Sequence, residues 1–105
     1  MNMKKPGLAA LWLSLTCAVP AWAQAVDPNL GRNMAANCAS CHGTNGASVG
    51  GMPTLAGQPR DYLARAMKEF REGKRPATIM HQLSKGYSDE QIELIAAYLS
   101  AQKAK

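Results

Sequence analysis

The sequence predicts a small all-α domain, and three observations support this fold class. Apolar residues recur at intervals of three and four in several segments, as they do on the buried face of a helix. No segment shows the strict alternation of apolar and polar residues that is typical of a strand. Glycine and proline gather between the periodic segments, where they favour irregular connections. A chain of 105 residues has room for one domain, so we expect a few helices joined by long loops.

Residues 1–23 have the pattern of a secretory signal peptide. Lysines precede the apolar run 8–19, and the small-residue pattern Ala-Trp-Ala ends at Ala23. The run is shorter than the roughly 20 residues that cross a bilayer, so we expect cleavage after Ala23 rather than a lasting N-terminal anchor. Neither glycine nor alanine directly precedes Cys17, which argues against a lipid-modified cysteine. The expected product is a single exported domain over residues 24–105, with no stable membrane insertion after cleavage.

The composition of this expected product restricts its partners and its source of stability. Cleavage lowers the formal net charge from +5 to +3, because two of the twelve lysines and arginines leave and all seven acids stay. No arginine-rich run and no basic run interleaved with aromatics is present, so we expect no nucleic-acid partner. A domain of about 80 residues is near the lower limit for a self-sufficient apolar core. A metal, a disulfide or a cofactor is therefore expected to stabilise it.

The first helix is predicted over residues 28–40. Asp27 suits the N-cap and Pro28 suits the first helical position, and apolar residues continue at helical spacing toward a pair of cysteines. An irregular connection is expected over residues 43–58, because five glycines and a proline interrupt any regular pattern there.

Three further helical segments complete the predicted architecture. A helix over residues 60–72 carries an apolar stripe and ends before a glycine. Residues 77–83 form a short helical piece that ends near Gly86. The last helix follows Ser88, which makes a capping-box pattern with Gln91. The expected apolar faces consist of Leu63, Ala66, Met67 and Phe70 in the second helix and of Ile92, Ile95, Ala96 and Leu99 in the last.

The segment Cys38-Ala39-Ser40-Cys41-His42 holds two thiols and one imidazole, and three chemistries compete for it. A closed zinc site needs four N or S ligands, whereas this segment offers three at most and His81 is the only other histidine. A thioredoxin-like disulfide stands at the start of a helix in a βαβ unit, whereas this pair ends a predicted helix and has no neighbouring strands.

Covalent haem is the third chemistry, and it fits the residues best. In a CxxCH motif the thiols, here Cys38 and Cys41, add to the haem vinyl groups, and the histidine, here His42, binds the iron. One haem c per chain also suits an exported protein and supplies the missing source of stability. We therefore expect the haem-free chain to be largely unfolded.

An electron-transfer haem needs a second axial ligand, and four methionines follow the predicted cleavage site. Met34 and Met67 occupy apolar helix stripes, which favours core packing. Met52, in the glycine-rich connection close to His42, competes as a ligand, but the adjacent Pro53 indicates another role for that segment. Met80 lies far enough along the chain to return to the other haem face, so it is the predicted distal ligand. His81 beside it is interpreted as a solvated neighbour rather than as the ligand of a bis-histidine haem.

With these residues in place, the chain from Asp27 to Gln102 resembles the class I c-type cytochromes. The resemblance implies helices around one covalently bound haem and a contact between Gly31 and Tyr98 where the first and last helices meet. It also implies that the carbonyl of Pro53 accepts a hydrogen bond from the haem histidine and so orients it.

Two longer segments are similar to the cytochrome subunits of flavocytochrome c sulfide dehydrogenases, namely NCASCHGTNGASVGGMPTLAGQ and GKRPATIMHQLSKGYSDEQIELIAAYL. In that group the methionine of the A-T-x-M segment binds the iron, and it corresponds to Met80. Related haem domains occur in dihaem cytochromes and in other sulfur-oxidation carriers. The single CxxCH motif implies a chain with one haem.

The resemblance implies a periplasmic one-electron carrier with no catalytic residue of its own. Its partner is expected to be the flavoprotein subunit of a sulfide dehydrogenase, and the alternative is a free-standing soluble shuttle between other respiratory redox proteins. A haem enzyme or gas sensor with a labile sixth ligand is a further class. The basic residues that are candidates for steering acidic partners toward the haem edge are Arg60, Arg71, Lys74, Arg75 and Lys85.

Overall fold

The computed structural model describes residues 2, 3, 7 and 27–104. The predicted signal peptide therefore lies outside the described residues, except for residues 2, 3 and 7, and Cys17 lies outside them as well. Within the described part of the chain, no helix has the length and apolar character needed to cross a membrane.

The described residues form helices and irregular connections, and they contain no strand. The all-α prediction is therefore confirmed. In chain order the elements are α1 (Leu30–Ala35), the 3₁₀ turn η1 (Ala36–Cys38), α2 (Ala39–His42), the 3₁₀ turn η2 (Thr44–Gly46), α3 (Arg60–Arg71), α4 (Met80–Leu83), the 3₁₀ turn η3 (Ser84–Gly86) and α5 (Asp89–Ser100).

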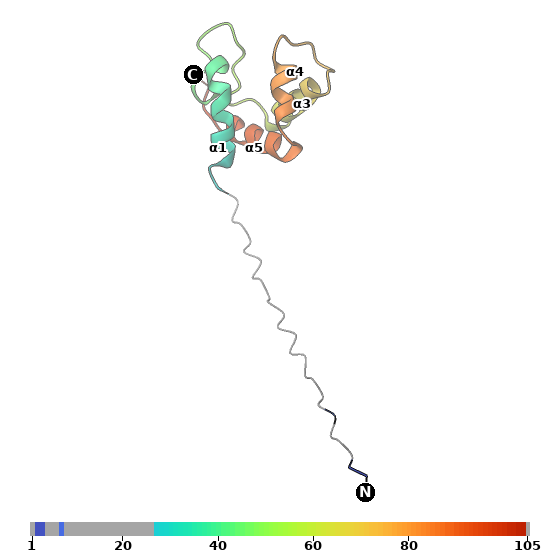
Figure 1. The fold of residues 1–105 in the computed structure, drawn as a ribbon. Helices are drawn as coiled ribbons and strands as arrows, with labels where there is room; N and C mark the ends of the chain where they lie inside the picture. The colour runs from blue at the N-terminus through green and yellow to red at the C-terminus, as the bar shows by residue number, and fades with distance from the viewer. Residues whose placement is uncertain (1, 4–6, 8–26, 105) are drawn as a thin grey trace.

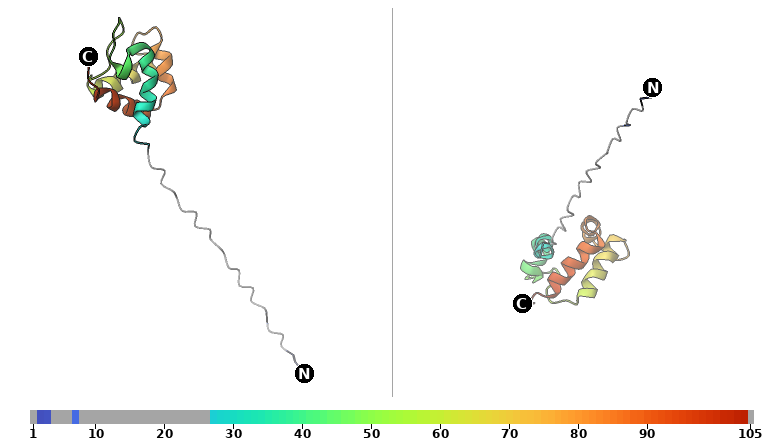
Figure 2. Two further views of the ribbon diagram at one scale, coloured as in Figure 1. Left: turned by 90° about the vertical axis from the view of Figure 1, so that its left-hand side faces the viewer. Right: turned by 90° about the horizontal axis from the view of Figure 1, so that it is seen from below.

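Helix α5 joins the two halves of the fold. It packs against α1 on one side and against α3 on the other, and α3 in turn contacts α4. Figure 1 shows α1 and the pair α3 and α4 on opposite sides above α5, and the view from below in Figure 2 shows the same arrangement. The CxxCH segment at the end of α2 and the start of α4 therefore belong to opposite halves of the molecule.

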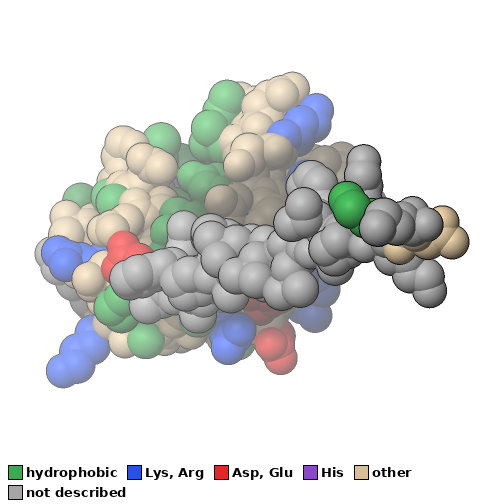
Figure 3. Space-filling view, turned by 60° about the horizontal axis from the view of Figure 1, so that its bottom comes forward, with side chains coloured by type: hydrophobic (Ala, Val, Ile, Leu, Met, Phe, Trp, Pro, Cys, Tyr) green, Lys and Arg blue, Asp and Glu red, His purple; other side chains and the backbone are tan. Residues whose placement is uncertain are grey.

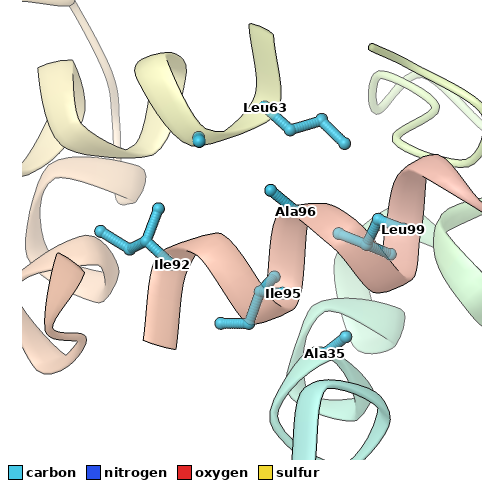
Figure 4. Packing of buried hydrophobic residues seen from close by; sticks show 7 residues of the cluster. Ala35, Leu63, Ile92, Ile95, Ala96 and Leu99 are labelled. Carbon is cyan, nitrogen blue, oxygen red and sulfur yellow. The ribbon is translucent and has the colours of Figure 1, made fainter. Parts of the chain in front are cut away.

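The core is small and lies along α5. The predicted face of this helix is buried, with exposures of 0% for Ile92 and Ile95 and 2% for Leu99. Ala35 from α1 and Leu63 from α3 pack onto it from either side (Figure 4). Alanines make up much of the remaining buried apolar surface, so few large side chains stabilise the fold by burial.

The N-terminal signals of the helices agree with the structure in one case and differ in another. Ser88 and Gln91 form the predicted capping box, with hydrogen bonds of 2.9 and 3.2 Å. The first helix begins at Leu30 rather than at residue 28, because the Asp27 carboxylate caps a preceding turn by accepting from the Asn29 amide at 2.8 Å. The helical run then continues through η1 and α2 to residue 42, two residues beyond the predicted end.

The connection from α3 to α4 begins with a regular helix end. Gly73 has φ of +73°, its amide donates to the Phe70 carbonyl, and the Lys74 amide donates to the Glu69 carbonyl. These two hydrogen bonds form the Schellman motif, so the predicted end of the helix at Gly73 is confirmed. Helix α4 begins only at Met80, three residues later than predicted, because Ile79 has a non-helical φ of −135°.

Candidate haem site

His42 is held in one orientation at the end of α2. Its side chain is 7% exposed, and Nδ1 donates a hydrogen bond to the Pro53 carbonyl oxygen at 2.7 Å. A carbonyl oxygen only accepts, so Nδ1 carries a proton, and in the neutral ring Nε2 then keeps its lone pair. A neutral imidazole with a lone pair on Nε2 and a fixed second partner on Nδ1 is the form that binds a metal.

The turn after His42 requires glycine. Gly43 ends α2 with φ of +86°, and a Cβ at this position would clash with the carbonyl of Ala47. The chain therefore reverses directly after the histidine. The reversed connection reaches Pro53, whose carbonyl meets the imidazole. The glycine-rich loop thus positions a partner for His42, which its irregular sequence alone does not reveal.

Cys38 and Cys41 lie one helical turn apart as free thiols, with Cys41 exposed and Cys38 partly buried. Burial raises the pKa of the Cys38 thiol, and the neighbouring Cys41 raises it to a smaller extent. A thiol oxidoreductase needs the opposite shift, because the thiolate is its nucleophile. The raised pKa of Cys38 thus argues against the thioredoxin-like interpretation.

Apolar side chains lie exposed near both halves of the candidate site. Ile79 and Leu83, on either side of Met80, are 49% and 50% exposed, and Met52 is 42% exposed. In Figure 3, hydrophobic side chains also lie where the surface recedes between two upper lobes. These exposed side chains stand beside the predicted ligand Met80 and beside Pro53, and a porphyrin ring bound there would cover apolar groups of this kind. The donor set and the apolar surface therefore both fit a haem.

The four methionines occupy different environments. Met34 and Met67 pack against the α5 core, so their interpretation as core residues is confirmed. Met52 lies next to Pro53 and is exposed. Met80 is partly buried at the first position of α4, in the half of the fold opposite to the half that holds His42.

His81 is not the solvated side chain that we expected. It is partly buried, and its Nδ1 atom is buried without a hydrogen-bond partner among the described residues. The Oγ atom of Ser84, three residues further along, is in the same condition. The reason for the difference is that α4 packs against α3, which encloses part of this short helix.

Four of the five basic residues proposed for steering are paired with acids. The ion pairs are Arg60–Glu93 at 3.4 Å, Lys74–Glu72 at 2.8 Å, Arg75–Glu69 at 2.8 Å and Arg71–Asp89. Lys85 makes no ion pair with the residues that the structure describes. Pairing cancels most of the field that a lone cation would exert on a partner, so the steering expectation is weakened for all but Lys85.

Two contacts of α5 help to hold the segments around the site. One is the crossing of α1 and α5, and the other is a hydrogen bond from Tyr98. A Cβ added at Gly31 would lie 2.7 Å from the Leu94 carbonyl oxygen and 3.6 Å from the Cβ of Tyr98, so the implied close contact is present. The hydroxyl of Tyr98 also donates to Oδ1 of Asn45 at 2.7 Å. Sequence reasoning missed Asn45, although an asparagine between Thr44 and Gly46 is a typical residue for its left-handed φ of 53°.

Comparisons with known proteins agree with this geometry. The family model described as cytochrome c matches residues 29–103. The cytochrome subunit of sulfide dehydrogenase from Chlorobaculum tepidum is 39% identical over 82 residues, which cover 75% of this chain and 74% of that protein. Cytochrome c-554(548) from Halomonas halodenitrificans is 39% identical over 81 residues, which cover 73% of this chain and 98% of that protein.

A solved structure extends the comparison to the fold. The cytochrome c4 of Acidithiobacillus ferrooxidans superposes with a TM-score of 0.61 at 29% identity, and the match covers 73% of this chain and 52% of that one. The chain thus spans about half the length of that protein. With the family match, the class I fold and the CxxCH residues in agreement, the chain belongs to the cytochrome c family: it is an electron carrier with a covalent haem c.

Proposed function

We propose that this cytochrome is exported to the periplasm and serves as the cytochrome subunit of a flavoprotein sulfide dehydrogenase. The flavoprotein would oxidise sulfide, and this chain would accept the electrons one at a time. The proposal is supported by the 39% identity with the sulfide dehydrogenase subunit, which extends over three quarters of both chains. Residues 1–23 would direct export and then be removed, which leaves residues 24–105 as a domain with one haem.

The proposed haem ligands follow from one hydrogen bond, that from Nδ1 of His42 to the Pro53 carbonyl. It leaves Nε2 as the nitrogen that would bind the iron, which supports His42 as the proximal ligand. Cys38 and Cys41 would hold the haem through thioethers. When bound, the haem supplies the one-electron chemistry, through the ferrous and ferric states of its iron. The chain's task is to hold both axial side chains in place, so that little rearrangement accompanies electron transfer.

Met80 is the proposed distal ligand, and the His42–Pro53 hydrogen bond also favours Met80 over Met52 for this role. Nδ1 points away from the metal when Nε2 binds it, so the Pro53 carbonyl lies behind the proximal imidazole. Met52 is the neighbour of Pro53 and would therefore lie on the proximal side. Met80 begins a helix of the opposite half and is partly buried, as a ligand on the other haem face must be.

The ligand assignment is tested by a matched pair of substitutions, Met80→Leu and Met52→Leu. Both remove a thioether and keep an apolar side chain of similar volume. We expect Met80→Leu to abolish the near-infrared sulfur-to-iron band and to permit rapid carbon monoxide binding to the ferrous protein, while Met52→Leu changes neither. A wild-type protein that already binds carbon monoxide rapidly would favour the haem enzyme or gas sensor instead.

The partner is tested on the protein from its native periplasm. We expect gentle purification of a C-terminally tagged chain to yield a near-stoichiometric flavoprotein, and sulfide to reduce the haem only when that flavoprotein is present. The mass of the purified cytochrome should correspond to residues 24–105. A cytochrome that purifies alone and stays oxidised in the presence of sulfide would contradict the subunit proposal.

A free-standing shuttle between other respiratory proteins is the second candidate function. It is supported by the match to the Halomonas halodenitrificans cytochrome, which covers 98% of a single-domain-sized protein. The two candidates differ in the lifetime of the complex. A shuttle would exchange electrons with quinol-oxidising or terminal-oxidase partners in brief encounters, and it would be recovered without a flavoprotein.

A further inference from the structure

Arg75 is the centre of a side-chain cluster on the connection between α3 and α4. Its Nε donates to Oε2 of Glu69 at 3.0 Å, and its second terminal nitrogen lies 2.8 Å from the same oxygen. The guanidinium carbon also lies 5.5 Å from the ring centre of Phe70 and 5.7 Å from that of Tyr62. These four residues form the Arg75 cluster.

The geometry of the Arg75 cluster differs from that of an ordinary surface ion pair. The side chains of Arg75 and Glu69 are 32% and 31% exposed, and the guanidinium meets two aromatic rings as well as the carboxylate. An arginine that makes two bonds to a carboxylate and lies over aromatic faces is held more firmly than a solvated lysine or arginine. Glu69 raises the pKa of Arg75, and Tyr62 raises it to a smaller extent, in agreement with this arrangement.

The backbone that follows Arg75 has little other support. Among the residues that the structure describes, no backbone hydrogen bond outside the helices involves residues 75–78. The Schellman motif ends at Lys74, and the next bonded carbonyl is that of Ile79, which accepts from the first residues of α4. Between these two points, the side-chain hydrogen bond and ion pair that the described residues 75–78 make with α3 both come from Arg75.

We propose that Arg75 is a positioning residue that holds the α3–α4 connection against α3 and thereby keeps Met80 at the haem iron. The inference rests on the proposed role of Met80 as distal ligand. Met80 lies five residues after Arg75, at the end of the segment without backbone hydrogen bonds. Because this segment leads directly into Met80, the attachment of Arg75 to residues of α3 limits how far the backbone at Met80 can move from the iron.

The chain offers a matched control for this proposal. Arg65 pairs with the same carboxylate of Glu69 at 3.9 Å, but it lies within α3 and is 65% exposed. Arg75→Gln and Arg65→Gln each remove one positive charge next to Glu69, and only the first releases the connection. Differences between these two variants therefore report positioning rather than charge.

The experiment measures how readily external imidazole replaces Met80 in the ferric protein with its haem attached. We expect Arg75→Gln to increase the apparent imidazole affinity about tenfold, which is the combined effect of an ion pair and two ring contacts, and Arg65→Gln to stay within about twofold of wild type. The near-infrared sulfur-to-iron band should also disappear at a lower temperature in Arg75→Gln. Arg75→Lys should restore part of the wild-type behaviour, because an ammonium can still meet Glu69.

The outcomes separate this inference from the ligand assignment. A wild-type protein without the near-infrared band would refute Met80 as ligand, and the positioning role would be refuted with it. A normal wild-type band together with equal imidazole affinities in Arg75→Gln and Arg65→Gln would overturn the positioning role alone. If Arg75→Gln does not assemble with haem, Tyr62→Leu removes one ring from the cluster instead. An about threefold rise in imidazole affinity is then expected, and an unchanged affinity would overturn the proposal.

Discussion

The hydroxyl of Tyr98 donates a hydrogen bond to Oδ1 of Asn45 at 2.7 Å and thereby joins the last helix to the turn that follows His42. The two residues are 53 positions apart in the chain. Asn45 has a left-handed φ of 53°, so the turn that presents its side chain depends on a conformation that few residues adopt. The helix that carries the core is thus also connected to the haem-binding segment.

Tyr98→Phe tests how much this hydrogen bond contributes to the stability of the fold. We expect the free energy of unfolding to fall by about 1 kcal/mol, because the variant removes one hydrogen bond and keeps the packing of the ring. Urea unfolding followed by far-ultraviolet circular dichroism measures the change. Tyr87→Phe is the control, because the Tyr87 hydroxyl makes no hydrogen bond to another described residue. Equal losses in both variants would show that the contact contributes nothing specific.

Gly31→Ala is expected to destabilise the crossing of α1 and α5. The added Cβ would lie 2.7 Å from the Leu94 carbonyl oxygen, which is rigid backbone, so the helices must move apart at a cost of about 1–3 kcal/mol. Gly86→Ala serves as the control because its Cβ would meet no atom within 4 Å. Thermal unfolding of the two variants gives the comparison, and a Gly31→Ala protein as stable as Gly86→Ala would contradict the close contact.

Ser88→Ala is expected to lower the free energy of unfolding by about 1 kcal/mol, because it removes the acceptor for the Gln91 amide at the start of α5. Ser88→Thr keeps a hydroxyl at the same position and should lose much less. Guanidinium unfolding curves of both variants measure the effect. A loss in Ser88→Thr as large as in Ser88→Ala would assign the effect to packing instead of capping.

The ion pair of Lys68 and Glu93 predicts an acid dependence of stability. The hydrogen bond from Lys68, at 2.9 Å, lowers the pKa of Glu93 in the folded state. A carboxylate with a lowered folded pKa stabilises the protein above its unfolded pKa, and this contribution is lost as the pH falls from about 5 toward 3. Glu93→Gln should therefore show a shallower loss of melting temperature over this range than wild type.

Glu90→Gln is the matched control for that measurement. Glu90 lies on the same helix and makes no ion pair with another described residue, so a comparison with Glu90→Gln separates loss of the Lys68 pair from loss of one carboxylate. Parallel slopes in wild type and Glu93→Gln would show that the Lys68 pair does not contribute to acid sensitivity.

Loss of the haem is expected to unfold the domain. The chain carrying Cys38→Ala and Cys41→Ala, purified free of haem, should show little helical circular dichroism. The reason is that the described core holds few large aliphatic side chains, with Leu63, Ile92 and Leu99 among them, and is otherwise made of alanines. A cooperative thermal transition in this variant would contradict the expectation.

The sequence by itself determined the helices and the residues of the haem motif. The apolar spacing in α3 and α5, the capping box at Ser88 and the glycine after α3 are local signals, and local hydrogen bonds or burial follow from them directly. The CxxCH spacing is likewise a local property of five consecutive residues. Errors arose at positions where two local preferences compete, as at Asp27 and in the residues before Met80.

Only the tertiary structure decided how distant segments meet. Asn45 accepts a hydrogen bond from Tyr98, and the Arg75 guanidinium lies over two rings of α3. Four of the five basic residues expected to face partners are paired with acids. Such contacts depend on where the chain reverses and on which helix faces pack together. No spacing within one segment encodes them, because they are fixed by the burial of α5 between α1 and α3.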